Sequence, residues 1–207
     1  MNKKLFGLST TALAAALALA GCSAGSGSGA AGTSAPGSSS ASAAASATTP
    51  AAGEHNAADT MFARMMIPHH AQAVEMSDMM LKKQDIPAEV TALATRIKAA
   101  QGPEIAKMTG WLNNWNEPTQ VPSGHSMDGS MDGMMGGADL KKLDAARGTD
   151  AAKLFLTQMT AHHEGAVKMA QTETTGGKYP DAVRLSKDIV ASQETEIQEM
   201  RDLLATL

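Results

Sequence analysis

The sequence predicts an all-α fold, an antiparallel four-helix bundle made of two similar helical hairpins. Apolar residues recur at helical spacing in four long segments, and no segment alternates as a strand would. Residues 61–80 recur as residues 154–173 at an offset of 93, and each copy contains two adjacent histidines. A second segment repeats at an offset of 92, so the repeated unit is a whole helical hairpin.

The N-terminal quarter of the chain lies outside this predicted bundle. Residues 1–21 have a basic start, an apolar run and small residues, which is the layout of a secretory signal peptide. The run ends in Leu-Ala-Gly-Cys, which resembles a bacterial lipobox and implies cleavage before Cys22 and lipidation of its thiol. An ordinary signal peptide with an incidental cysteine is the alternative. Residues 22–53 are almost entirely Ser, Ala, Gly, Thr and Pro, and are predicted to form a disordered tether.

The folded domain is predicted to cover residues 54–207, which is long enough for one core. The chain has 17 basic and 21 acidic side chains, and this acidic balance argues against nucleic acid as a partner. Its single cysteine is Cys22, so the domain has neither a disulfide nor a thiolate metal site. Methionine is unusually frequent instead, with 15 in the chain, all but Met1 in the domain.

The first helix is predicted over residues 59–83, with Asp59 or Thr60 as its N-cap. Pro68 lies within it and is expected to bend the axis, because proline removes one backbone hydrogen bond. A helix that begins near Pro68 is the alternative. It would separate residues that share one apolar stripe, namely Phe62, Met66, His69, Ala73, Met76 and Met80.

The remaining elements follow from their terminal residues and their periodicity. Pro87 suits the first turn of a helix, and Gly148 suits the end of one. The predicted elements are a second helix over residues 87–115, a loop over 117–138 rich in Pro, Gly, Ser and Asp, a short helix over 139–147, a third long helix from Thr149 or Asp150 to about residue 174, and a fourth over 181–204.

The doubled histidines are the main candidate functional residues. Adjacent residues on a helix point about 100° apart, which places His69 on the core stripe and His70 beside it. Imidazole together with thioether suits Cu(I) and Ag(I), whereas zinc and iron favour carboxylate or thiolate partners. Core packing by the methionines and hydrogen bonding by the histidines is the alternative. Residues four apart are neighbours, which gives the pairs Met65–His69, Met66–His70 and Met159–His163.

The loop supplies a second set of candidate soft ligands. On a flexible polar chain a methionine has no apolar neighbours to pack against, so ligation is the favoured interpretation and low-complexity filler the alternative. Asp128 and Asp132 add negative charge that attracts a cation. The candidates are His125, Met127, Met131, Met134 and Met135.

Signatures of common enzymes are absent from the sequence. A ferritin-like di-iron site needs E-x-x-H, but methionine, isoleucine or threonine stands three residues before each paired histidine. The motif H-E-x-x-H, a glycine-rich phosphate loop and G-x-S-x-G are also missing. The protein is therefore expected not to be an enzyme. A copper oxidoreductase stays an alternative, because sequence does not separate copper storage from copper chemistry.

The motifs M-M-I-P-H-H-x-x-A-V-x-M and H-H-E-G-A-V-x-M-A, with two I-x-x-x-Q-x-x-E-I-x-x-M segments, resemble the bacterial family called domain of unknown function 305. The resemblance covers residues 59–207 and implies a ferritin-like helical bundle. Because the family includes CopM-type periplasmic copper-binding proteins, it also implies an exported, non-enzymatic copper-handling protein. Thr160-Ala161 replaces the Ile67-Pro68 of the first motif, which predicts a straighter helix there. The implied metal ligands are Met66, His69, His70, Met76, Met159, His162, His163 and Met169.

Together these features predict an extracytoplasmic protein, anchored to the outer face of the membrane through Cys22, that binds copper ions. Cu(I) is favoured and Ag(I) is its mimic. Metal tolerance, storage and delivery are the roles considered. The alternative that involves no metal is a helical bundle with a structural role or a role in binding another protein.

Overall fold

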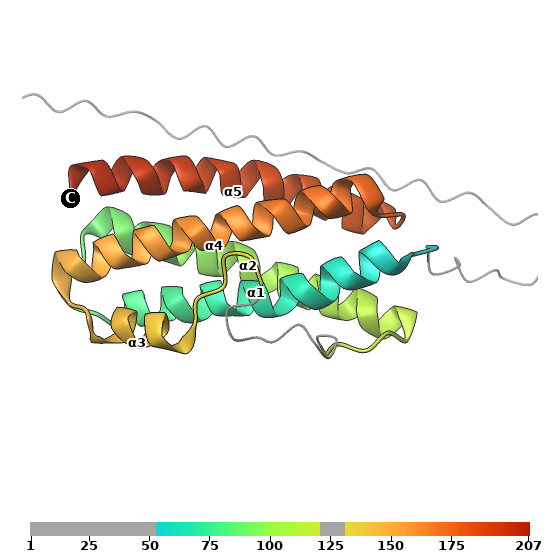
Figure 1. The fold of residues 1–207 in the computed structure, drawn as a ribbon, viewed down its shortest axis with the longest axis horizontal. Coiled ribbons are helices and arrows are strands. Elements are labelled where there is room, and N and C mark those ends of the chain that lie inside the picture. The colour runs from blue at the N-terminus through green and yellow to red at the C-terminus, as the bar shows by residue number, and fades with distance from the viewer. Residues whose placement is uncertain (1–52, 121–130) are drawn as a thin grey trace, which may run out of the picture. The chain divides into compact units, whose positions relative to one another are not determined.

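The computed structural model describes residues 53–120 and 131–207 of the chain. In these ranges the chain forms α-helices and no strand, which confirms the predicted all-α bundle (Figure 1). The helices are α1 (Ala57–Leu81), α2 (Ala88–Trp115), α3 (Gly137–Ala145), α4 (Gly148–Gly176) and α5 (Pro180–Thr206). The predicted signal peptide, Cys22, most of the tether and residues 121–130 of the loop lie outside the described residues.

The four long helices pack as two hairpins, α1 with α2 and α4 with α5, and α1 also packs along α4 (Figure 1). The two copies of the repeated sequence thus occupy equivalent places in the two hairpins. The short helix α3 lies against α1 and α4. None of the helices in the described part of the chain is both long enough and apolar enough to cross a membrane.

The apolar core consists of two clusters that follow each other along the bundle. The cluster near the start of α1 and the end of α4 includes Phe62, Met66, Met108, Trp111, Ala166 and Leu185. The cluster near the end of α1 and the start of α4 includes Met76, Met80, Leu93, Phe155, Met159 and Met200. On each long helix, buried polar residues stand between the two apolar groups. The hydrophobic core is therefore interrupted midway along the bundle.

The N-cap of α1 is Asn56, three residues before the predicted Asp59. The Asn56 side chain accepts hydrogen bonds from the backbone N–H groups of Ala58 and Asp59, and the Asp59 carboxylate accepts one from the Asn56 N–H at 2.6 Å. Asp59 is thus the third residue of a capping box and not the cap itself. It also accepts from the N–H groups of Lys178 and Tyr179, which ties the start of α1 to the α4–α5 turn.

Helix α1 runs without a break through Pro68. This agrees with the predicted helix over residues 59–83 and contradicts the alternative of a helix that begins near Pro68. The prediction that Gly148 closes the short helix is wrong, because α3 ends at Ala145 and Gly148 begins α4 with a φ of +50°. Arg147 explains why α3 needs no glycine at its end. Its guanidinium donates to the carbonyls of Asp144, Ala145 and Ala146, which satisfies the terminal acceptors of the helix.

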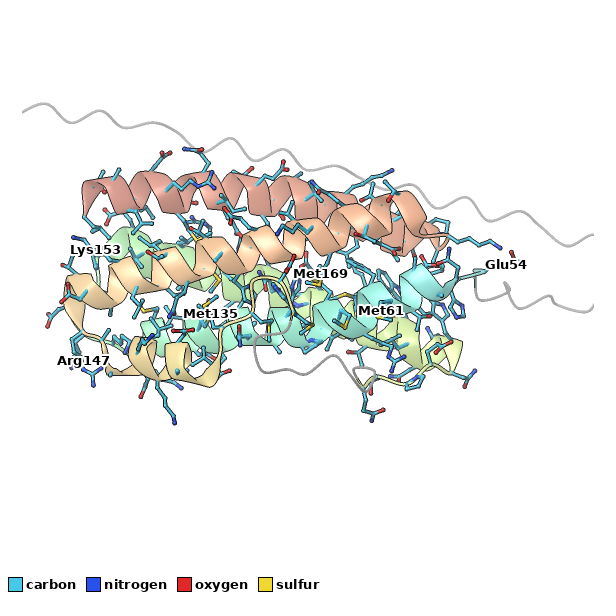
Figure 2. All side chains as sticks on the ribbon, in the orientation of Figure 1. Glu54, Met61, Met135, Arg147, Lys153 and Met169 are labelled. Atoms are coloured by element: carbon cyan, nitrogen blue, oxygen red, sulfur yellow. The ribbon has the colours of Figure 1, made fainter. Side chains whose placement is uncertain are left out.

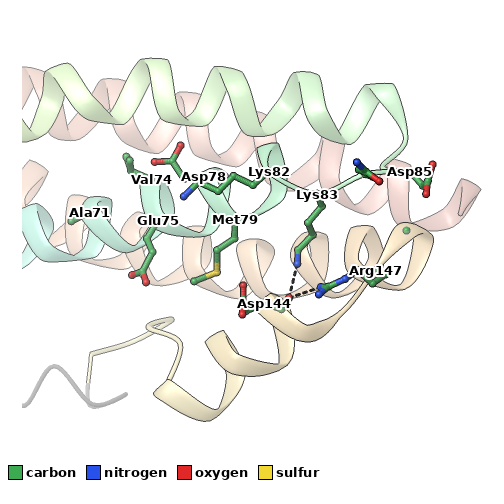
Figure 3. Close-up of a pocket in the computed structure, with 12 residues that line it drawn as sticks. Ala71, Val74, Glu75, Asp78, Met79, Lys82, Lys83, Asp85, Asp144 and Arg147 are labelled. Carbon is green, nitrogen blue, oxygen red and sulfur yellow. Dashed lines mark hydrogen bonds between the residues drawn. The ribbon is translucent and has the colours of Figure 1, made fainter.

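The junction between α3 and α4 is also fastened to the end of α1. The Lys83 ammonium donates to the carbonyls of Asp144 at 2.8 Å and Ala146 at 3.1 Å, beside Arg147 (Figure 3). These residues border an open cleft of about 960 Å³ whose other charged groups include Glu75 and Asp78. The cleft contains no histidine among its lining residues, so it lies apart from the predicted ligands.

Candidate metal centre

The two histidine pairs meet in the middle of the bundle, where the apolar core is interrupted. The exposed fractions are 0% for His69, His70 and His163, and 1% for His162. The rings of His69 and His162 lie in contact, with centroids 3.7 Å apart and planes tilted by 37°. The structure therefore brings together the residues that the sequence repeat singled out. Both members of each pair are buried, although only His69 and His162 were expected on the core stripe.

Two glutamates from the other helices of the hairpins hold the second histidine of each pair. His70 Nε2 lies 2.7 Å from Glu104 Oε2 of α2, and His163 Nε2 lies 2.7 Å from Glu196 Oε2 of α5. A carboxylate only accepts hydrogen bonds, so Nε2 carries the hydrogen and Nδ1 carries the free lone pair. Such a carboxylate also increases the basicity of an imidazole that binds metal through its other nitrogen.

The sequence around the histidines does not indicate these two carboxylates, because each lies on the other helix of its hairpin. The signal was nevertheless present, since the repeat aligns Glu104 with Glu196 and Gln101 with Gln193 at the same offset of 92. Both glutamines are buried as well. We call the set formed by these residues and the histidines the polar layer: His69, His70, Gln101, Glu104, His162, His163, Gln193 and Glu196.

Several nitrogen atoms in the polar layer have no hydrogen-bond partner in the described part of the protein. His69 Nε2 lies 3.3 Å from the carbonyl oxygen of Asp132, and this contact occupies one of its two nitrogens. The atoms without a partner include His162 Nδ1 and Nε2, and the Nδ1 atoms of His69, His70 and His163. Buried polar atoms without partners are costly and rare in folded proteins. A bound cation would supply the missing interaction to a lone pair.

The electrostatic surroundings keep three of the imidazoles neutral at pH 7. Burial lowers the pKa of His69 to about 3 and holds the pKa of His162 well below its ordinary value, with the neighbouring histidines acting in the same direction. Burial also lowers the pKa of His70, and Glu104 opposes that shift. Only a neutral imidazole has a lone pair for a metal, so these side chains are in the protonation state that ligation requires.

The methionines named by the family resemblance fall into three different surroundings. Met66 and Met159 are fully buried and stand one turn before His70 and His163, one in each apolar cluster next to the polar layer. Met76 is fully buried two turns after His69, in the same apolar cluster as Met159. Met169 is half-buried and lines a surface pocket with Met61 and Met65, away from the histidines.

The prediction that the loop methionines have no apolar neighbours is wrong for the described part of the loop. Met131 is 5% exposed and Met134 is 8% exposed, and Met135 packs against the apolar cluster. The segment folds onto the bundle because the Gln72 side chain binds both backbone polar groups of Met135. Gln72 Nε2 donates to the Met135 carbonyl at 2.9 Å, and its Oε1 accepts from the Met135 N–H at 2.7 Å. His125 and Met127 lie outside the described residues.

We call residues 131–136 the strap, because they cross directly over the contact between His69 and His162. Gly165 of α4 makes room for this crossing, since a Cβ atom there would lie 1.9 Å from the carbonyl oxygen of Asp132. Gly133, with a φ of +83°, turns the strap against the backbone of His162. Gly165 occupies the position in its repeat that Gln72 occupies in the first copy. The two copies thus differ at the place where the strap is received.

The donor atoms at this centre favour a soft cation. Within residues 53–120 and 131–207, no three side chains of His, Cys, Asp or Glu are arranged to hold a metal ion together. The available donors are imidazole nitrogens in the polar layer and thioether sulfurs on either side of it. Nitrogen and thioether donors suit Cu(I) and Ag(I).

The family model described as domain of unknown function (DUF305) matches residues 59–204. Among solved structures, a DUF305 protein from Streptomyces coelicolor assigned as secreted is 40% identical, with a TM-score of 0.67, covering 72% of this chain and 93% of that chain. A DUF305 fragment from Deinococcus radiodurans is 30% identical, with a TM-score of 0.67, covering 73% and 98%. CopM in its Cu(I)-bound form is 32% identical, with a TM-score of 0.59, covering 72% and 96%. No curated protein matches the chain.

Proposed function

The chain belongs to the DUF305 family, and on that premise we propose that it is a copper-binding protein that takes up Cu(I), with Ag(I) as a mimic. The observation that carries the proposal is the set of unpartnered imidazole nitrogens in the polar layer, beside the buried sulfurs of Met66 and Met159. Its similarity to CopM, which was crystallised with Cu(I), Cu(II) and Ag, supports the same ligand class.

In this proposal copper is cargo and not a catalytic cofactor. The candidate ligands in the bundle are the four paired histidines, with Met66 and Met159 one turn away. Glu104 and Glu196 orient two of the imidazoles through their Nε2 atoms. The strap methionines Met131, Met134 and Met135, with His125 and Met127 of the same loop, would capture the ion and pass it inward. Met76 is a more distant candidate, and Met169, which the family resemblance also implies as a ligand, lies at a separate surface pocket.

We further propose that the protein works outside the cytoplasm and contributes to metal tolerance, storage or delivery. The support is the signal-like residues 1–21 followed by Cys22 in a lipobox-like motif, together with the similarity to the Streptomyces coelicolor protein assigned as secreted. Labelling cells with a radioactive fatty acid tests the anchor. Label that stays on the Cys22→Ser variant would contradict lipidation at this thiol.

Titration of the purified mature protein with Cu(I) against a competing chelator tests the bundle site. The quadruple variant His69→Ala, His70→Ala, His162→Ala and His163→Ala is expected to lose the tightly bound copper. Because four cavities threaten folding, the double variant Met66→Leu and Met159→Leu provides a volume-conserving test and should weaken binding by about tenfold. Met80→Leu is the control, since Met80 is buried in an apolar cluster almost three helical turns beyond His70. Unchanged affinity in a folded quadruple variant would refute the bundle site.

A purely structural role for the polar layer is the competing function. The observation in its favour is that the hydrogen bonds from His70 to Glu104 and from His163 to Glu196 already link the two helices of each hairpin. A structural role predicts that Cu(I) leaves the melting temperature unchanged. Copper binding to the native state predicts a rise that grows with free Cu(I) concentration.

A further inference from the structure

A second cluster of sulfur atoms lies at the surface, where the start of α1 faces the end of α4. Met61, Met65 and Met169 line one pocket of about 330 Å³ together with Phe62 and Glu173. Figure 2 shows Met61 on α1 and Met169 on α4 beside this pocket. No histidine lines it. The pocket is therefore separate from the polar layer.

Core packing does not account for Met61 and Met65, whereas Met169 packs in part against the apolar cluster that includes Phe62. Met61 is 41% exposed and is the one large hydrophobic residue of the described chain that is classed as exposed. Met65 and Met169 are half-buried, whereas Phe62 between them is 5% exposed and belongs to the core. Met61 and Met65 stand one helical turn apart on the same face of α1, and Met169 approaches from α4. Two rigid helices thus present three thioethers to one open pocket.

Thioether sulfurs are neutral and soft, so a group of three discriminates for Cu(I) and Ag(I) and against hard cations and protons. The pocket walls are predominantly apolar, which disfavours a hydrated divalent ion. Glu173, the acidic residue among those lining the pocket, is 1% exposed, and burial together with the neighbouring Asp59 raises its pKa to about 8, so this carboxyl is neutral at pH 7. The three thioethers are therefore the donors that this pocket offers to a cation.

We propose that Met61, Met65 and Met169 form a solvent-facing site for Cu(I) or Ag(I), distinct from the histidine centre. The proposal rests on the proposed function, because it takes copper as the cargo. Met65 stands one turn before His69, which corresponds to about 6 Å along the helix axis. An ion bound at the surface site is thus one short step from the buried imidazoles. The site provides a second route by which the ion reaches the polar layer, besides the loop methionines.

The test uses the mature chain and Ag(I), which binds thioethers and does not change oxidation state. The triple variant Met61→Leu, Met65→Leu and Met169→Leu keeps side-chain volume. It is expected to bind one Ag(I) fewer per chain in calorimetric titration, while the histidine quadruple variant keeps that equivalent. In the wild-type protein, the methyl resonances of these three methionines should shift together when Ag(I) is added. Met79→Leu is the matched control, since Met79 is a half-buried methionine of α1 in a different cleft.

Each outcome separates this proposal from the proposed function. Full Ag(I) stoichiometry in the triple variant, or methyl resonances of Met61, Met65 and Met169 that do not move, would overturn the surface site. If the histidine variant then loses its metal, the bundle site stands alone. If the triple variant loses one equivalent and the histidine variant loses none, the surface site stands and the bundle site fails. Loss of an equivalent in Met79→Leu would also overturn the assignment to these three residues.

Discussion

Glu104 and Glu196 decide which nitrogen of a buried imidazole is available. Each carboxylate accepts the Nε2 hydrogen of its histidine at 2.7 Å, which leaves Nδ1 without a partner. The backbone of His69 interacts weakly with the His162 ring, but neither ring nitrogen makes a hydrogen bond of normal geometry within the described residues that would fix the tautomer. Each pair of histidines therefore contains one member that is oriented by a carboxylate, His70 and His163, and these are the members with a buried methionine one turn before.

Replacing both carboxylates by amides tests this orienting role. The double variant Glu104→Gln and Glu196→Gln keeps the shape but provides a weaker acceptor that is also able to donate, so both tautomers become accessible. We expect the Cu(I) affinity of the bundle site to fall by about tenfold, as measured by chelator competition. Glu75→Gln, on the exposed face of α1, is the control. An affinity equal to that of the wild type would show that the glutamates serve only to join the helices.

Glu173 makes the stability of the metal-free protein depend on pH. Burial, followed by the neighbouring Asp59, raises the pKa of Glu173 from 4.5 to about 8. The folded state therefore keeps a proton that the unfolded state loses at lower pH, and stability falls as pH rises toward 8 and levels off above it. The buried histidines act in the opposite direction, but their contribution is complete once the pH exceeds the unfolded histidine value of about 6.5.

Measurements between pH 7 and 8.5 separate the contribution of Glu173 to stability from that of the histidines. There, the melting temperature of the wild-type protein should decrease with pH, and that of Glu173→Gln should stay nearly level, in calorimetry without metal. Glu164→Gln is a suitable control, because Glu164 forms an exposed ion pair with Arg201. Equal slopes for the wild type and Glu173→Gln would contradict the raised pKa.

At the scale of elements, the position of the strap depends on one residue of α1 and one of α4. Gln72 binds the strap, and Gly165 has no side chain that would collide with it. Gln72 makes two hydrogen bonds to the backbone of Met135, and Gly165 leaves space for the carbonyl of Asp132. The four histidines have almost no exposed surface beneath it. A cation that reaches the contact between His69 and His162 from this side must therefore pass the strap.

Adding one methyl group at Gly165 should detach the strap. In Gly165→Ala the new Cβ would lie 1.9 Å from the Asp132 carbonyl oxygen, while α4 itself gains helix propensity. We expect hydrogen exchange of the Met135 amide to accelerate on the order of tenfold or more, and Ag(I) uptake to become faster. Gly110→Ala in α2 is the control, because a Cβ there meets nothing within 4 Å. Unchanged protection of Met135 would show that the backbone adjusts without releasing the strap.

At the scale of the whole molecule, the polar layer divides the hydrophobic core into two parts. Gln101 illustrates the free-energy cost of burying polar groups in this layer. It is 3% exposed, and neither its Nε2 nor its Oε1 has a hydrogen-bond partner in the described structure. A buried polar group without a partner costs about 1–3 kcal/mol. The layer therefore lowers the stability of the metal-free bundle.

The variant Gln101→Met tests this statement, since it retains the length of the side chain and removes its polar atoms. We expect the free energy of unfolding to rise by about 1 kcal/mol in urea titration without metal. Gln171→Met, at an exposed position of α4, should change stability by less than about 0.5 kcal/mol. Destabilisation by Gln101→Met would mean that the amide makes an interaction, for example with ordered water, that outweighs its burial.

The sequence was sufficient for the architecture because the duplication and the apolar periodicity are local patterns. It was also sufficient to select the histidines, since doubled histidines in register are visible without coordinates. It was not sufficient for Glu104 and Glu196, which reach the site from other helices through packing. It was misleading for Met131 and Met134, because a composition typical of a loop does not reveal the hydrogen bonds from Gln72 that place the segment on the core. Asn56 was missed as the N-cap because Asp59 is an equally suitable capping residue.

The difference between Gln72 and Gly165 has a consequence for the history of the molecule. Two identical hairpins that associated as a dimer would carry the same residue at both positions. A glutamine that binds the strap from one hairpin would then stand in the other hairpin where Gly165 leaves space for the strap. Fusion of the two hairpins into one polypeptide removes this constraint, because each copy then mutates independently. A cover on a single side of the centre is thus a property that two identical hairpins cannot have and a fused chain can.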